Sequence, residues 1–135
     1  MILYLILFNS LINSLDIDSC KVFNDSYTIS FCNKFEISNI KKTENAFAMP
    51  FSVYLTKKYR NIFVQDRKVY DDILYAIGSN CKGVKRVECF PSYNVVRFKR
   101  LKHGKRVANA VVNIDGLNVV FGVVKTRNGS YFIYP

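Results

Sequence analysis

The stretch that decides the fold is RVANAVVNIDGLNVVFGVV, residues 106–124, in which two apolar runs flank Asp115-Gly116. An Asp-Gly step between two apolar runs is typical of the tight turn of a β-hairpin. Every second residue from Ala108 to Ile114 is apolar, as expected for a strand that packs one face on a core. The stretch therefore predicts two long antiparallel strands.

Other strand and turn signals extend this hairpin in both directions. Arg127-Asn128-Gly129 predicts a second turn, so that SYFIYP (130–135) forms the third strand of a meander. Short apolar or β-branched runs predict further strands at 26–31, 35–40, 46–55, 84–90 and 94–101.

One segment has the periodicity of a helix instead. In DRKVYDDILYAIGSN, the residues Val69, Ile73 and Ile77 recur every four positions. Asp66 is a suitable N-cap and Gly78 a suitable C-cap. We therefore expect an α+β protein, mostly antiparallel β meanders with one principal helix at about 66–78.

Two segments of the chain resemble each other. IKKTENAFAMP (40–50) aligns with VKTRNGSYFIYP (124–135), and each follows earlier strand-like runs. The repeat suggests an internal duplication, with one unit at 1–80 and a shorter unit at 81–135, packed as one compact domain. Repeated meanders predict an approximate two-fold relation between the units.

The repeated unit resembles the SpoVG (stage V sporulation protein G, septation regulator) family. The matching segments are the turn and strand TENAFAMP (43–50), the basic loop FSVYLTKKYRNI (51–62) and the helix VYDDILYAI (69–77). The resemblance implies a small DNA- or RNA-binding regulator that dimerises by sheet pairing, so that two units in one chain would form a pseudo-dimer. It also implies nucleic-acid contacts from the basic loop, through Lys57, Lys58 and Arg60.

The chain departs from that family in three places. The first apolar run lacks alternating charges, Phe51-Ser52-Val53 stands where basic residues are expected, and the second unit ends at Pro135 without a loop or helix. These departures shift our expectation for the main binding surface away from the loop.

The charge of the chain is concentrated in its C-terminal part. The net charge is +10; residues 1–80 carry 9 Lys and Arg against 8 Asp and Glu, whereas residues 81–135 carry 11 against 2. A field of this sign favours polyanions such as nucleic acid. The densest group of basic residues lies in the predicted strand at 94–101 and the turn after it, where Arg97 and Lys99 alternate with Val96 and Phe98. We expect the phosphate contacts to come mainly from Arg97, Lys99, Arg100, Lys102, Lys105 and Arg106.

The sequence therefore predicts a cytoplasmic nucleic-acid-binding regulator that is not an enzyme. DNA and RNA both remain open as its target, with a homo-oligomer formed by sheet-edge pairing as a further expectation. Tyr131, Phe132 and Tyr134 are able to stack on bases, although packing in the core is the simpler interpretation. No metal-ligand spacing, phosphate loop or carboxylate pair occurs, so we expect no metal, cofactor or small-molecule substrate.

The cysteines and the N-terminus leave an alternative open. Cys20, Cys32, Cys81 and Cys89 are interpreted as thiols buried in strands, but two disulfides are expected if the chain is secreted. The apolar run at 2–8 is interpreted as a buried strand, and alternatively residues 1–19 form a signal peptide. The alternative function is then a secreted or membrane-associated binding protein.

A hydrolase is the least favoured alternative. Cys81 and His103 would act as nucleophile and base, with Asn113 or Asp115 orienting the imidazole. A catalytic cysteine of this kind should begin a helix, whereas SNCKGVKRVECF (79–90) has the pattern of a loop leading into a strand. His103 is more simply an exposed turn residue in a basic cluster.

Overall fold

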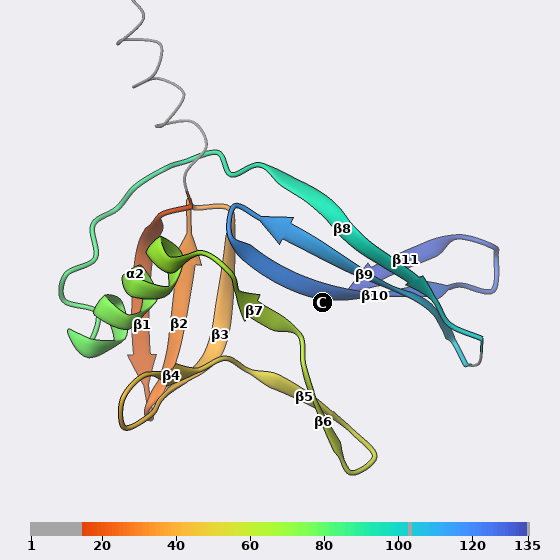
Figure 1. Cartoon of the computed structure of the whole chain (residues 1–135), viewed down its shortest axis with the longest axis horizontal. Coiled ribbons are helices and arrows are strands. Elements are labelled where there is room, and N and C mark those ends of the chain that lie inside the picture. The colour runs from red at the N-terminus through yellow and green to blue at the C-terminus, as the bar shows by residue number, and fades with distance from the viewer. Residues whose placement is uncertain (1–14, 103, 135) are drawn as a thin grey trace, which may run out of the picture.

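A computed structural model describes residues 15–102 and 104–134 of the chain. This part is mostly antiparallel β-sheet with one helix, which confirms the expected α+β class (Figure 1). In order, its elements are β1 (Ile17–Phe23), β2 (Ser26–Phe31), β3 (Phe35–Lys42), β4 (Phe47–Ala48), β5 (Phe51–Tyr54), β6 (Lys57–Arg60), β7 (Ile62–Val64), α2 (Arg67–Gly78), β8 (Tyr93–Arg100), β9 (Arg106–Ile114), β10 (Leu117–Lys125) and β11 (Tyr131–Tyr134).

The first sheet is a four-stranded meander in the order β1-β2-β3-β4. Asn24 and Asp25 make the β1–β2 turn with φ of 48° and 62°, a left-handed conformation that asparagine and aspartate tolerate. Along β2 every second residue is buried, namely Tyr27, Ile29 and Phe31. The period of two thus turns one face of the sheet toward the core.

Helix α2 covers that face of the first sheet. Its buried residues Val69, Ile73, Ala76 and Ile77 belong to the same buried cluster as the inward side chains of β2 and β3. The Asp66 carboxylate accepts a hydrogen bond from the Val69 backbone N–H at 3.4 Å, as expected of an N-cap.

The C-terminal end of α2 differs from expectation. Gly78 is the last helical residue rather than the cap, and Ser79 caps the helix by donating its N–H to the Tyr75 carbonyl at 3.0 Å. Asn80 and Cys81 then take positive φ values of 53° and 68° and turn the chain away.

The second sheet is another meander, in the order β11-β10-β9-β8. Asp115 and Gly116, with φ of 42° and 99°, form the β9–β10 turn, and Asn118 pairs with Asn113 across it. The hairpin and the following turn into β11 are both confirmed. Leu117 and Val119 of β10 belong to the same buried cluster as α2 and β2, so one core serves both halves.

The two meanders place the repeated segments alike. Residues 35–48 supply the third and fourth strands of the first sheet, and residues 117–134 supply the third and fourth strands of the second. The halves are not separate, however, because β7 comes from the first half and pairs with β10. Val120 also donates its N–H to the Asn61 carbonyl at 2.7 Å.

Several local expectations need correction. The expected strand at 84–90 is irregular. The expected strand at 46–55 is divided around Pro50 into β4 and β5, and the expected basic loop at 51–62 contains the β5–β6 hairpin. The sequence patterns also missed β1 and β7. The apolar run at 2–8 lies outside the described residues.

The cysteines form two disulfides, so the expectation of separate buried thiols in strands is wrong. Cys20 bonds to Cys81 and Cys32 to Cys89. Cys81 and Cys89 lie in the irregular segment 79–92, which the two bonds attach to the first sheet. These contacts hold in place a segment that has no strand partner.

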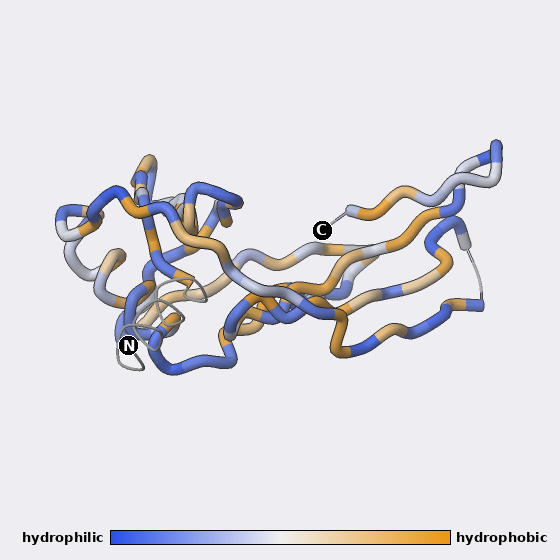
Figure 2. The backbone as a smooth tube through the Cα atoms, turned by 90° about the horizontal axis from the view of Figure 1, so that it is seen from above, coloured by the Kyte–Doolittle hydropathy of each residue, from blue (hydrophilic) through white to orange (hydrophobic). Residues whose placement is uncertain are grey.

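The second sheet extends away from the core along the long axis of the molecule, as Figure 2 shows. The tips of its hairpins farthest from the first sheet are hydrophilic, whereas the strands leading to them carry hydrophobic positions. In the described part of the chain, no helix is both long enough and apolar enough to cross a membrane.

Candidate nucleic-acid interface

The predicted basic strand is β8, where Arg97 and Lys99 lie on one face of the sheet and Phe98 lies on the other. Residues paired across two strands share a face of the sheet. Arg97 pairs with Val111 and Lys99 with Asn109, whereas Phe98 pairs with Ala110 and so faces the other way. All eight residues of β8 are exposed, and a register shift between Val95 and Arg97 interrupts the pairing.

Arg106 begins β9 and lies on the same face as Arg97 and Lys99. Its guanidinium carbon stands 5.5 Å from the ring centroid of Tyr134 on β11, a cation–π arrangement. Gly122 lies beneath it, since a Cβ built on that glycine would come within 2.7 Å of Arg106 Nε. The absence of a side chain at Gly122 therefore lets the arginine lie flat against the sheet.

Amide and aromatic groups complete this face. Asn109 pairs with Gly122, and Gly122 pairs with Tyr134, so the three form one row across the sheet. Phe132 lies beside Tyr134 with ring centroids 6.3 Å apart and planes inclined by 20°. We call this surface the basic face and define it by Arg97, Lys99, Arg106, Asn109, Gly122, Phe132 and Tyr134.

The remaining predicted cations lie around the end of the sheet. Lys102 and Lys105 are exposed in the β8–β9 turn, and Arg100 pairs with Ala108 on the opposite face from Arg97. The β10–β11 turn lies at the same end (Figure 1) and adds Lys125 and Arg127, which are not among the predicted site residues. In an antiparallel meander alternate turns lie at the same end of the sheet, so the predicted meander already implied that the β8–β9 and β10–β11 turns lie together.

The charge balance at this end of the sheet is one-sided. Residues 93–134 contain eight Lys and Arg but a single carboxylate, that of Asp115. Asp115 lies in the β9–β10 turn at the opposite end, where its carboxylate accepts hydrogen bonds from the Ser92 backbone N–H at 2.9 Å and hydroxyl at 2.8 Å. The tips therefore present positive charge with no acidic residue of this segment beside it.

The other predicted cations form a separate surface. Lys57, Lys58 and Arg60 are exposed on β6 of the β5–β6 hairpin, which Figure 1 shows as its own projection. Lys58 Nζ lies 4.8 Å from the ring centroid of Phe51 on the partner strand. The fold does not merge these cations with the basic face into one cluster.

An apolar groove occupies the opposite face of the second sheet. Its volume is about 910 Å³, and it lies between β3 and strands β8–β10. Among its lining residues are Phe35, Ile37, Phe90, Val95, Val112 and Phe121. The alternating apolar positions of β9 were expected to pack in the core, but part of that face lines the groove.

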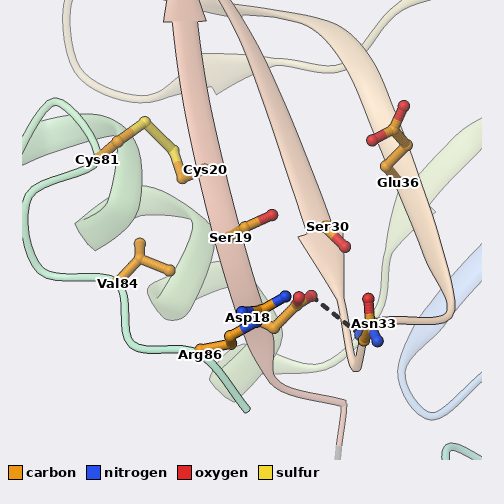
Figure 3. Close-up of a pocket in the computed structure, with 9 residues that line it drawn as sticks. All are labelled: Asp18, Ser19, Cys20, Ser30, Asn33, Glu36, Cys81, Val84 and Arg86. Atoms are coloured by element: carbon orange, nitrogen blue, oxygen red, sulfur yellow. Dashed lines mark hydrogen bonds between the residues drawn. A yellow bond between two sulfur atoms is a disulfide. The ribbon is translucent and has the colours of Figure 1, made fainter. Parts of the chain in front are cut away.

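A smaller, polar pocket of about 500 Å³ lies beside the Cys20–Cys81 disulfide (Figure 3). Its buried carboxylate, Asp18, accepts a hydrogen bond from the Asn33 backbone N–H at 3.0 Å. Within residues 15–102 and 104–134, no group of three or more His, Cys, Asp and Glu residues is placed to hold a metal ion.

The structure bears directly on one residue of the hydrolase alternative. Cys81 is bonded to Cys20, and a disulfide sulfur is not a thiolate nucleophile. His103 lies outside the described residues. The geometry therefore offers no support for cysteine catalysis at this position.

In comparisons with known proteins, no protein-family model, curated protein or solved structure matches this chain. The resemblance to the SpoVG family thus stays a prediction drawn from short motifs.

Proposed function

We propose that this protein binds nucleic acid, DNA or RNA, through the basic face and the adjoining hairpin tips of the second sheet. The observation that supports this most directly is the gathering of Arg97, Lys99 and Arg106 on one sheet face, next to the exposed ring of Phe132 and the half-buried ring of Tyr134. Lys and Arg on a sheet contact phosphate oxygens without reading the sequence, and they release condensed counterions when they do so.

The arrangement suits a polyanion better than a small anion. The cations are spread over two strands and two turns, so an extended chain of phosphates satisfies more of them than a single phosphate does. Six phosphate contacts give a slope of about −5 for log K against log salt on duplex DNA. A regulatory role, which the resemblance to the SpoVG family implies, stays part of this proposal.

The test is a fluorescence-anisotropy titration of a labelled 20-nucleotide oligonucleotide, single-stranded and duplex, at several salt concentrations. We expect micromolar or tighter binding at about 50 mM salt that weakens steeply as salt rises. The absence of binding at about 50 mM salt to either form would remove the proposal.

Paired variants identify the surface. Arg97→Ala/Lys99→Ala removes two cations from the basic face, and Lys57→Ala/Lys58→Ala removes two from the β5–β6 hairpin. All four side chains are exposed, so both variants should fold. We expect the first pair to lose more affinity and to reduce the salt slope by about two. A larger loss in the second pair would show that the hairpin is the binding surface.

The proposed homo-oligomer depends on the edges of the sheets. β8 pairs only with β9 among the described strands, so its outer edge offers unpaired N–H and C=O groups. Light scattering over a concentration series tests the association. A monomer at all concentrations would exclude sheet-edge pairing as a stable interaction.

A second candidate function is favoured by the two disulfides. Disulfides persist in oxidising compartments and are rare in the cytosol, so Cys20–Cys81 and Cys32–Cys89 fit a secreted or membrane-associated binding protein. The mass of the intact protein from its native host, taken after thiol blocking, separates the two candidates. Loss of residues 1–19 together with unblocked cysteines would favour secretion, and a full-length chain with four blocked thiols would favour the cytoplasm.

A further inference from the structure

Two polar atoms on the basic face have no hydrogen-bond partner. They are Arg106 Nε and Asn109 Oδ1, and no other buried side-chain nitrogen or oxygen of the described residues is left unpaired. The cost of leaving a buried donor or acceptor unsatisfied is comparable to that of losing a hydrogen bond. Such groups close to a protein surface are candidates for a place where a ligand supplies the missing partner.

The two atoms belong to one small area. Asn109 pairs with Gly122, and the Arg106 guanidinium lies over that same glycine. One atom is a donor and the other is an acceptor. A phosphate carries only acceptors at neutral pH, so it can satisfy Arg106 but not Asn109, whereas the edge of a nucleobase carries donors and acceptors side by side.

An exposed aromatic ring lies next to this area. Phe132 is 60% exposed, and it is stacked beside Tyr134, which itself contacts the Arg106 guanidinium. An exposed phenylalanine on a sheet face with flanking cations is the arrangement with which single-stranded nucleic acids are bound, since each unpaired base can stack on a ring.

We infer that the basic face binds an unpaired nucleobase, stacked on Phe132 and hydrogen-bonded to Arg106 and Asn109, so that the protein prefers single-stranded nucleic acid to duplex. This inference rests on the proposed function. In a duplex the faces of the bases are stacked on each other and their pairing edges are occupied. Only the phosphate contacts of the basic face and the hairpin tips would then remain.

Arg106 is the group that has to move for the base to enter. Its Nε is covered in this structure, and Tyr134 holds the guanidinium by a ring contact. The guanidinium is at the end of a flexible side chain, so a base that stacks beside Tyr134 can displace it and then accept its hydrogen bond.

The test compares three probes of equal length, which are a labelled single strand, the corresponding duplex and an abasic single strand that keeps the phosphates. We expect the single strand to bind at least tenfold more tightly than the other two. Phe132→Leu should weaken single-strand binding by about 5- to 160-fold, the range for loss of one base stack. Phe132→Tyr should keep the affinity, and Phe132→Leu should leave duplex binding unchanged.

The matched control is Tyr131→Leu. Tyr131 is the preceding residue of β11, is 64% exposed and points to the opposite face of the sheet, where it pairs with Lys125. The Tyr131→Leu variant should bind all three probes with the same affinity as the unchanged protein. Equal binding of single strand, duplex and abasic strand, or equal effects of Phe132→Leu and Tyr131→Leu, would overturn the base site while leaving the proposed function intact. Failure of every probe to bind would instead remove the proposed function.

Discussion

Arg106 on β9 lies across Gly122 on the neighbouring strand β10. Its guanidinium occupies the space that a side chain at position 122 would need. A Cβ on Gly122 would be 2.7 Å from Arg106 Nε, 2.8 Å from Arg106 Cζ and 2.8 Å from Tyr134 Cζ. The glycine therefore determines the position of a cation on the basic face, although it has no functional group of its own.

Gly122→Ala should reduce binding more than stability. The new methyl group displaces the guanidinium, which is the end of a flexible side chain, so we expect the free energy of unfolding to change by about 1 kcal/mol or less. Affinity for a single-stranded oligonucleotide should fall several-fold. Denaturant unfolding and anisotropy measure the two quantities. If Gly122→Ala weakens binding equally in an Arg106→Ala background, the effect does not act through Arg106.

Gly116→Ala should be strongly destabilising. Gly116 has φ of +99°, and a Cβ there would lie 2.3 Å from the Cβ of Asp66, which is the N-cap of α2. Backbone strain and overpacking together should cost about 3 kcal/mol. Gly129→Ala is the matched control, because Gly129 has φ of +87° and open space around it, so about 1–2 kcal/mol is expected. Equal losses in chemical unfolding would contradict the proposed contact with Asp66.

Removing one disulfide should lower the stability substantially. Cys20 and Cys81 are 61 residues apart, and in the chain-entropy description a bond closing a loop of that size contributes about 4 kcal/mol. Because the loop from Cys32 to Cys89 overlaps it, the measured loss for Cys20→Ala/Cys81→Ala should be smaller, about 2–4 kcal/mol. Urea unfolding of the oxidised proteins measures the difference, and an unchanged midpoint would argue against this pairing.

Lys68 should contribute a small stabilisation that disappears at high pH. Partial burial lowers its pKa, but hydrogen bonds to Asp16 at 2.6 Å and to Asp72 at 3.1 Å outweigh that effect, so the pKa is raised. A raised folded pKa means that the stabilisation is complete below the unfolded pKa of about 10.4 and is lost as pH rises through the folded pKa.

The variant Lys68→Gln tests this pH dependence. Its free energy of unfolding should be lower by about 1 kcal/mol or less, because Lys68 and its partners Asp16 and Asp72 are partly exposed. This deficit should shrink only above about pH 10.4. Arg67→Gln, which breaks the exposed pair with Asp71, is the control, since an arginine stays charged over this range. A deficit for Lys68→Gln that stays constant to the highest pH would contradict the assignment.

Much of the fold is visible in local sequence patterns. Helix α2 follows from an apolar period near four and from Asp66, because the cap and the amphipathic face involve only neighbouring residues. The long strands β9 and β10 follow from alternation around Asp115-Gly116, since turn geometry sets the register of a hairpin. The alternation of charge along β8 likewise follows from the period of two.

The segments that escaped prediction depend on distant partners. Residues 84–90 alternate like a strand but pair with no described strand, and the segment is held instead by the Cys32–Cys89 bond and by Lys34 against Phe90. β7 is only three residues long and is defined by pairing with β10, more than fifty positions later.

For the candidate site too, some features follow from local sequence patterns and others depend on distant partners. The sequence by itself determined that the C-terminal part is basic and that Arg97 and Lys99 share a strand face, because both facts are set by residue type and by spacing along one strand. Only the tertiary structure decided which cations gather, bringing Lys125 and Arg127 to the tip and leaving Lys57, Lys58 and Arg60 on a separate hairpin. It also placed Arg106 over Gly122 and against Tyr134, since a contact across strands depends on the register between segments that are far apart in the chain.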